Sequence, residues 1–443
     1  MELLGGRRLP LWAGALVLAV VLPRFALFGV LRGRLPMPPR DQELYIRLAG
    51  QLLAGHGLSF SPDEAAAKHG RAPEDAVGQS WSGTRGLVFG IAAAGEPTAT
   101  VEPGYPLLLA LAFAITGPAT GSVFLLNTLF FLAGAFALRE LVRRSWGEPA
   151  ANLSAFLWAL YPPFVYYTAY AMTEAAHVSL LVVALLLVHG SKRGGVAFPA
   201  GAGAVLGVLF LIRATALLLL PFLIGWVVWS RWRSGLRRVV AGAAPMLAAF
   251  CLVLAPWVVR NSIRMGAPVV MPTKGSLNLW MRNNPEALAV EGIGLPGWVS
   301  GTVSRRELLL YPDLPAGADE LERSGALGDR AMEFALANPT LLAWLVPVRL
   351  GAFMDLSPGG GPAAIAALLM FGGVTAAGCV GLYLNRRYST ASLLALVYIV
   401  YALVHSLAHG GVRYRIPVET VMIVGTALLA RRLLQATREG GQQ

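Results

Sequence analysis

Long apolar runs separate the polar segments of this 443-residue chain. A helix needs about 20 apolar residues to cross the hydrocarbon core of a bilayer. The first run, 11–31, is too long for a signal-peptide core and lacks a small-residue cleavage site, so it predicts an uncleaved anchor. About ten spans are expected, at 11–31, 120–138, 150–170, 174–190, 196–212, 214–230, 239–258, 362–384, 390–409 and 416–434.

The composition also indicates an integral membrane protein. Hydrophobic residues make up 56% of the chain and charged residues 14%, whereas a soluble domain carries roughly 25% charged residues. The net charge is +12, but the basic residues are dispersed between apolar stretches, which excludes a nucleic-acid-binding patch. Cys251 and Cys379 form no CxxC pair, which excludes a disulfide scaffold, a zinc ribbon and a CxxC redox site.

Basic clusters predict the orientation in the membrane. With ten spans and a cytoplasmic N-terminus, all six clusters fall on the cytoplasmic side, as the positive-inside rule requires. Twenty of the 24 acidic residues then lie in or beside outward-facing segments, so we expect any chemistry on the outer face. The clusters are Arg7/Arg8, Arg139/Arg143/Arg144, Lys192/Arg193, Arg231/Arg233/Arg237/Arg238, Arg386/Arg387 and Arg431/Arg432/Arg438.

Two outward segments hold most of the polar sequence: a first outer loop, 32–103, and a second large segment, 259–340. Neither is long enough to predict an independent domain. The expected fold class is an all-α integral membrane protein, a bundle of about ten transmembrane helices with amphipathic surface helices in the first outer loop and in a later one. Residues 1–443 are expected to form a single transmembrane domain.

The first outer loop contains an amphipathic pattern over 41–53. Leucines recur at every fourth position with Tyr45 beside them, which is typical of a helix lying on the membrane surface. Asp41 stands where an N-cap belongs, and Glu43 would complement the helix dipole. A carboxylate at the membrane surface could instead accept a proton from a hydroxyl. Both roles stay open for these two residues.

Other outer segments carry further candidate groups. Glu102, with Tyr105 in a Pro-Gly-Tyr-Pro element, predicts a turn before a short helix near the outer surface. Tyrosines over 161–170 are typical interfacial anchors, and Thr173 suits a helix cap. Glu174 follows, and an ionisable residue at the edge of a span usually has a partner.

Four outer arginines depart from the inside bias, and they could anchor at the interface or bind a phosphate bidentately. Arg260 and Arg415 are the best candidates for a phosphate site, followed by Arg213 and Arg413. His405 and His409 lie four apart on one helical face and are candidate ligands of a divalent metal ion, although no HExxH pattern accompanies them.

Six short motifs follow one another along the chain: Asp41 with Tyr45-x-x-Leu-Ala49, Pro103-Gly-Tyr-Pro106, Tyr161-Pro-Pro through Thr173-Glu174, Pro256-Trp-x-x-Arg-Asn261, Asn278-Leu-Trp with Asn283-Asn-Pro285, and Arg413-Tyr-Arg-x-Pro417. Each motif is short, but their ordered combination is fairly specific. In this order they resemble the motifs of the polyprenyl-phosphate-sugar-dependent membrane glycosyltransferases of the GT-C superfamily, in the bacterial branch of aminoarabinose transferases and protein mannosyltransferases.

The resemblance implies that Asp41 is the catalytic carboxylate of the first outer loop and Glu174 the second acid. It also implies a lipid-linked sugar donor that enters from the membrane. The chain departs from the adjacent Asp-Glu pair of some members, because Gln42 separates Asp41 from Glu43. The candidate substrate-binding positions are Glu43, Tyr45, Glu102, Tyr105 and Asn278.

The expected function is transfer of a sugar from a polyprenyl-phosphate-linked donor to an acceptor hydroxyl on the outer face of a bacterial plasma membrane, facing the periplasm or the cell exterior. Direct displacement would invert the anomeric centre. The acceptor is a lipid, a glycan or a protein, the membrane lipids are partners, and a divalent metal ion is the one candidate cofactor. A transporter or flippase of lipid-linked glycans is the main alternative, although its polar groups should line a path at membrane depth; a non-catalytic assembly subunit is the other.

Overall fold

The structure, a computed structural model, describes residues 10–31, 40–61, 87–88, 91–93, 95–284, 317–354, 368–408 and 412–440. Helices dominate this part of the chain. Its one sheet is a two-stranded antiparallel ladder between β1 (Leu87–Val88) and β2 (Ala92–Ala93). The predicted all-α fold class is therefore confirmed.

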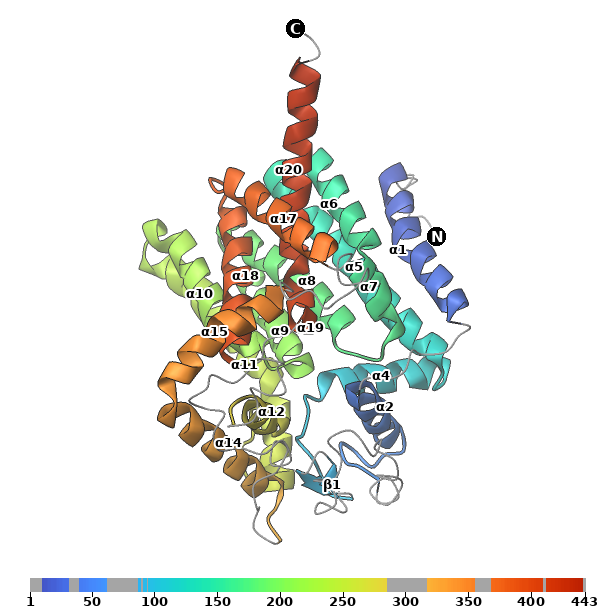
Figure 1. The fold of residues 1–443 in the computed structure, drawn as a ribbon, viewed down its shortest axis with the longest axis vertical. Helices are drawn as coiled ribbons and strands as arrows, with labels where there is room; N and C mark the ends of the chain where they lie inside the picture. The colour runs from blue at the N-terminus through green and yellow to red at the C-terminus, as the bar shows by residue number, and fades with distance from the viewer. Residues whose placement is uncertain are drawn as a thin grey trace.

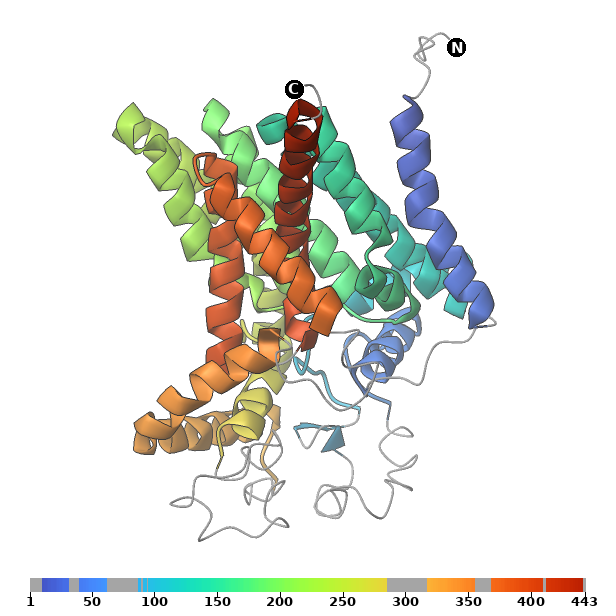
Figure 2. The same ribbon diagram turned by 45° about the horizontal axis from the view of Figure 1, so that its top comes forward.

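The long helices run side by side as a bundle (Figures 1 and 2). Short elements, α7 (Pro162–Tyr166) and the 3₁₀ turn Tyr167–Ala169, connect two of them. The bundle helices are α1 (Leu11–Val30), α5 (Thr120–Trp146), α6 (Glu148–Leu160), α8 (Glu174–Gly190), α9 (Ala197–Ile212), α10 (Ala216–Arg231), α11 (Leu236–Met265), α17 (Gly373–Leu384), α18 (Ser389–Ala408) and α20 (Glu419–Gly440).

The expected count of ten spans is not confirmed. Six helices of the described residues are long and apolar enough to cross a membrane, or up to seven if a bent pair counts as one span. That pair is α14 (Glu320–Ala337) and α15 (Pro339–Met354), which meet at 100°. Helix α9 has 16 residues and extends only about 24 Å at 1.5 Å per residue, less than the 30 Å core. The run 196–212, which was counted as a span, therefore forms a helix shorter than the hydrocarbon core is thick.

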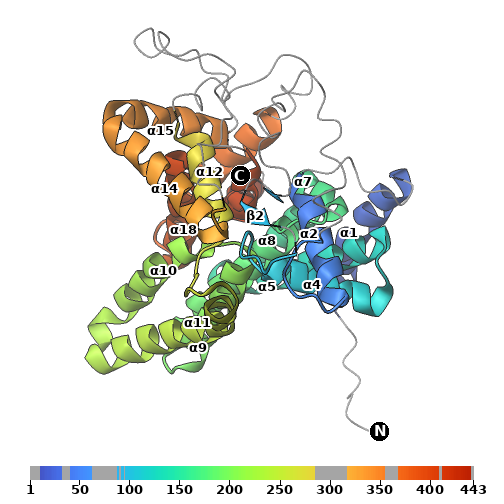
Figure 3. The same cartoon turned by 90° about the horizontal axis from the view of Figure 1, so that it is seen from below.

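A layer of further helices covers one end of the bundle (Figures 1 and 3). It contains α2 (Arg40–Leu53), α4 (Gly104–Thr116), α12 (Lys274–Arg282) and α14. Helix α2 packs its apolar face against α4, where the Tyr45 and Tyr105 rings meet edge to face with centroids 5.3 Å apart. The amphipathic pattern over 41–53 thus forms a helix as predicted, and its apolar face is covered by protein.

The helix ends that carry the described basic clusters lie at the opposite end of the bundle, where α1 begins and α20 ends (Figure 2). Arg231 donates to the carbonyl of Ser191 at 3.0 Å, and Arg431 donates to the carbonyl of Trp146 at 2.6 Å. Lys192 bonds Ser389 across the same end. The described clusters of positive charge and the layer of surface helices therefore lie at opposite ends of the molecule.

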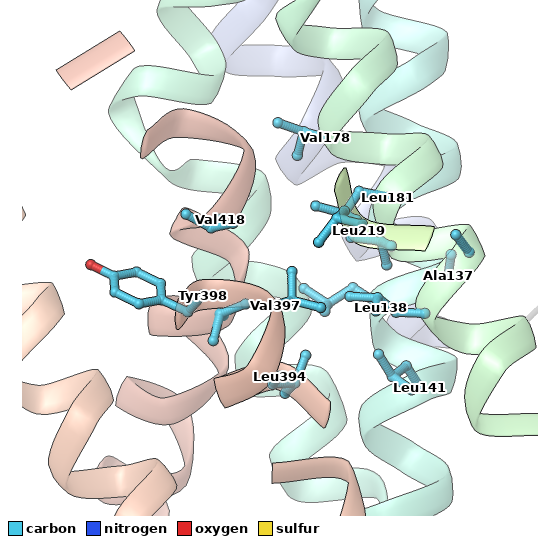
Figure 4. Packing of buried hydrophobic residues seen from close by; sticks show 14 of the residues in the cluster. Ala137, Leu138, Leu141, Val178, Leu181, Leu219, Leu394, Val397, Tyr398 and Val418 are labelled. Carbon is cyan, nitrogen blue, oxygen red and sulfur yellow. The ribbon is translucent and has the colours of Figure 1, made fainter. Parts of the chain in front are cut away.

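The core between the helices combines aliphatic side chains with aromatic ones such as Tyr398 (Figure 4). Leu138 from α5, Leu181 from α8, Leu219 from α10 and Val397 from α18 are each 0 or 1% exposed. Within a bilayer, apolar side chains gain little by leaving lipid, so close packing is the main source of helix association.

Glycines bring α17 and α20 into backbone contact. A Cβ added at Gly425 would lie 2.1 Å from the carbonyl oxygen of Gly378, and one added at Gly381 would lie 1.8 Å from the oxygen of Gly425. Real Cβ atoms do not approach backbone this closely, so neither position can hold a larger residue without moving a helix. Small residues of this kind are typical of membrane helix interfaces.

Replacing Gly425 with alanine should therefore destabilise the protein by about 1–3 kcal/mol, the usual cost of overpacking. Gly373→Ala is the matched control, because nothing lies within 4 Å of its added Cβ, and alanine favours the helix. The unfolding temperature in detergent should fall for Gly425→Ala and stay unchanged or rise for Gly373→Ala. Equal temperatures for the two variants would contradict the close contact of α17 and α20.

Candidate functional site

Five charged side chains from distant parts of the chain meet at the end of the bundle that α2 covers. Helices α2, α8 and α12 each begin there, and the chain between α9 and α10 turns there (Figure 1). The short helix α19 (Val412–Arg415) completes the arrangement. We call these residues the site cluster: Asp41, Glu174, Arg213, Lys274 and Arg413.

Arg413 bridges the two carboxylates of the site cluster. Its Nη1 donates to Asp41 Oδ2 at 2.8 Å, and its Nε donates to Glu174 Oε1 at 2.6 Å. Lys274 Nζ donates to Asp41 Oδ1 at 2.5 Å, and Arg213 Nη1 lies 3.5 Å from Glu174 Oε1. The two acids that the motif order predicted are thus joined through one arginine.

The two carboxylates differ in burial. Glu174 is fully buried, whereas the Asp41 side chain is 24% exposed. Burial raises the pKa of Asp41, but the charges of Lys274 and Arg413 lower it by more, so that the pKa lies below its ordinary value. Asp41 is therefore ionised at neutral pH, and it is a weak base while both cations hold it.

Glu102 lies beside the site cluster. Its Oε1 accepts a hydrogen bond at 2.6 Å from the backbone N–H of Ala214, the residue after Arg213. Burial raises the pKa of Glu102, and this effect exceeds the opposing ones of Ala214, Arg213 and Lys274. Glu102 therefore has a stronger tendency to hold a proton than Asp41 has.

The other predicted substrate-binding residues are divided between the protein interior and its surface. Tyr45 and Tyr105 are buried, and the Tyr105 hydroxyl donates to Asn127 Oδ1 at 3.4 Å. Glu43 is exposed and pairs with Arg47 one turn along α2. Asn278 is exposed one turn after Lys274 on α12. The structure thus brings the two tyrosines together and leaves Glu43 and Asn278 open to the surroundings.

Arg260 and Arg415, the two arginines ranked first from sequence, contact the backbone of the protein. Arg260 donates to the carbonyls of Thr98 at 2.8 Å and Leu58 at 2.9 Å. Arg415 is fully buried, pairs with Glu419, and donates to the carbonyls of Met354 and Phe371 at 2.7 and 2.9 Å. These bonds hold loops and helices together, whereas Arg213 and Arg413, ranked second, belong to the site cluster.

One of the two predicted metal ligands, His405, is buried among aromatic rings. His405 is 4% exposed, and its ring stacks on those of Phe353 and Tyr414, with centroids 6.0 and 4.7 Å away. His409 lies outside the described residues. No group of three or more His, Cys, Asp or Glu side chains that could hold a metal ion occurs in the part of the chain that the structure describes.

Lys274 was missed by the sequence reasoning. It is one of only three lysines in a chain with 33 arginines, and it is the one lysine in the outward segment 259–340. This rarity is the one sequence signal that marks it. Its position is defined by its neighbours. The backbone N–H of Lys274 donates to the Thr100 carbonyl at 3.2 Å, and the Thr273 hydroxyl donates to Oε1 of the buried Glu320 at 2.7 Å.

Residues 97–259 match the family described as dolichyl-phosphate-mannose-protein mannosyltransferase. No curated protein matches the chain. Among solved structures, the oligosaccharyltransferase of Archaeoglobus fulgidus with zinc and sulfate has a TM-score of 0.57 at 14% identity, over 96% of this chain and 49% of its own. The same enzyme, AglB, with an inhibitory peptide and a dolichol-phosphate has a TM-score of 0.54 at 14% identity, over 97% and 52% of the two chains.

ArnT of Cupriavidus metallidurans bound to undecaprenyl phosphate is a more distant match, with a TM-score of 0.42 at 13% identity, over 95% of this chain and 78% of its own. This chain spans about half the length of the oligosaccharyltransferase. The match over residues 97–259 and the shared fold confirm the predicted resemblance to the GT-C membrane glycosyltransferases.

Proposed function

We propose that the chain transfers a sugar from a polyprenyl-phosphate-linked donor to an acceptor hydroxyl on the outer face of the membrane. The observation that carries this proposal is the site cluster, in which two carboxylates and three cations meet at the end of a membrane bundle. A sugar phosphodiester needs a base for the acceptor and positive charge for the leaving phosphate. The site cluster contains both kinds of group.

In the proposed reaction, Asp41 accepts the proton of the acceptor hydroxyl as its oxygen attacks the anomeric carbon. The bond from that carbon to the phosphate oxygen breaks, and its electron pair stays on the phosphate. Arg413 and Arg213 are the proposed phosphate ligands, since the N–H groups of Arg260 and Arg415 already bond backbone carbonyls. A direct displacement of this kind inverts the anomeric centre.

Glu174 is the proposed second acid. Its Oε1 holds Arg413 and lies near Arg213, so it orients both guanidinium groups. Its Oε2 is buried and, within the described residues, has no hydrogen-bond partner. A buried carboxylate oxygen favours a hydrogen-bond donor, and a hydroxyl of the acceptor other than the attacking one would be such a donor.

Separation of charge between the two ends of the bundle supports the proposed orientation. The described basic clusters lie at the end of the bundle where α20 ends, and α2, which begins at the site cluster, covers the other end (Figure 2). Basic residues favour the cytoplasmic side. The site cluster would then face the periplasm or cell exterior of a bacterial plasma membrane. Segments 32–103 and 259–340 would lie outside, as parts of one transmembrane domain.

Cysteine labelling tests this orientation. In a variant without Cys251 and Cys379, a cysteine at exposed Asp329 on α14 should react with an impermeant maleimide added to right-side-out vesicles. A cysteine at Lys192 should react only after the vesicles are opened. The reverse pattern would place the site cluster inside.

The transferase activity itself is tested in vesicles that contain the purified protein. Radiolabelled polyprenyl-phosphate sugars are supplied with total membrane lipids, glycans and peptides as acceptors, and transfer of label to an acceptor is the expected result. A flippase would instead move the donor between leaflets with no new glycosidic bond. Label that only changes leaflet would favour that alternative over a transferase.

A further inference from the structure

We infer that the donor phosphate and the Asp41 carboxylate compete for the same two cations, Lys274 and Arg413, so that donor binding releases the catalytic carboxylate. This inference rests on the proposed function. Lys274 then joins the residues that bind the donor. The structure corresponds to the resting state of the site, in which Asp41 pairs with both cations.

Both oxygens of Asp41 are occupied in this state, Oδ1 by Lys274 at 2.5 Å and Oδ2 by Arg413 at 2.8 Å. A carboxylate held by two cations has little tendency to take a proton. To act as a base, Asp41 must therefore give up at least one of them. An anion that binds the cations in its place would allow this.

The burial of the partners indicates which bond is replaced. Arg413 also donates to Glu174, which is fully buried at the start of α8 and cannot leave. Asp41 is the more exposed acid, at the first turn of the surface helix α2. A phosphate that arrives from the membrane would thus displace Asp41, while Glu174 and Arg213 keep Arg413 in place.

The charges of the cluster also suit an added anion. Its two carboxylates face three cations, so one positive charge exceeds the negative ones. A donor phosphodiester carries one negative charge. After transfer, the polyprenyl phosphate is a monoester with a charge of roughly −1.5 to −2 at pH 7. Lys274 and Arg413 therefore stabilise the leaving phosphate more than the bound donor, which favours the transition state.

Asp41 also takes part in product release and in the return of the site to its resting state. The acceptor proton that Asp41 has taken passes to solvent, which restores the carboxylate. The restored carboxylate then competes again for Lys274 and Arg413 and helps to displace the polyprenyl phosphate. Substrate binding, base activation and product release would share one pair of cations.

Affinity for undecaprenyl phosphate tests the competition without any sugar transfer. Asp41→Asn keeps the shape of the side chain but removes its charge, and should bind this probe about tenfold more tightly than the wild type. Lys274→Met and Arg413→Gln should bind it at least about tenfold more weakly, and Lys274→Arg should restore part of the loss. Asp329→Asn, the same change at an exposed site on α14, should leave affinity unchanged.

A general repulsion between Asp41 and the probe would also disappear in Asp41→Asn, so a double-mutant cycle separates the two causes. Competition predicts that the gain from Asp41→Asn largely disappears in a Lys274→Met, Arg413→Gln background. A gain that persists there, or no gain in the single variant of confirmed fold, would overturn the inference. These affinities are independent of transfer: competition without transfer from any donor would reject the proposed function alone, and transfer without competition would reject the inference alone.

Discussion

Replacing Asp41 with asparagine should lower the rate of sugar transfer about 10²- to 10⁴-fold, the usual contribution of a general base. Asparagine has nearly the same size and also favours the first turn of a helix, so α2 and its packing against α4 should persist. Initial rates at saturating donor, measured in vesicles, give the effect on transfer. The unfolding temperature of the same preparation shows whether the fold is kept.

Asp329→Asn is the matched control, since it makes the same chemical change at an exposed position of the outer layer. Its rate should equal that of the wild type. A folded Asp41→Asn protein that transfers sugar at the wild-type rate would remove Asp41 from the role of base. Glu102, whose pKa burial raises, would then be the next carboxylate to test.

Breaking the pair of Arg415 and Glu419 should have the largest effect on stability. Both side chains are fully buried, and the Tyr161 hydroxyl also donates to Glu419 Oε2 at 2.8 Å. Removing one partner of such a pair costs about 3–5 kcal/mol, because the other charge stays buried alone. Glu419→Gln and Arg415→Met should each lower the unfolding temperature strongly.

Two further variants test whether the loss of stability comes from the buried pair of Arg415 and Glu419. Arg264→Met replaces an exposed arginine near the end of α11 and should change stability by less than about 0.5 kcal/mol. The double variant Arg415→Met, Glu419→Leu should recover much of the loss, because no lone charge remains. If Arg415→Met instead keeps its stability and loses donor affinity, Arg415 binds phosphate as its rank in the sequence suggested.

The surface helices were predictable from sequence because their pattern is local. Leucines at every fourth position after Asp41 define α2, and the Pro-Gly-Tyr-Pro element precedes α4 where a short helix was expected. The number of spans was not predictable in the same way. Apolar runs show where a chain can enter lipid, but a run such as 196–212 does not show whether its 16-residue helix, Ala197–Ile212, crosses the bilayer.

The charged residues of the site were likewise predictable only in part from the sequence. Motif order singled out Asp41 and Glu174, which the structure brings together, but it ranked Arg260 and Arg415 above Arg213 and Arg413. An arginine shows its partners only after folding, because carbonyls of remote segments such as Thr98 and Met354 occupy its donors. Lys274 belongs to no motif, and although it is a rare lysine, only its contact with Asp41 shows its place in the site.

The pairing of Asp41 with Arg413 also bears on how the protein is made. The two residues are 372 positions apart, and at roughly 5–20 residues per second the ribosome adds Arg413 about 20–75 seconds after Asp41. During this interval helix α2 is already at the membrane, but Asp41 cannot yet pair with Arg413. The site is therefore completed among the last steps of biogenesis, and a chain released before residue 413 would contain most of the bundle but no bridge between its two acids.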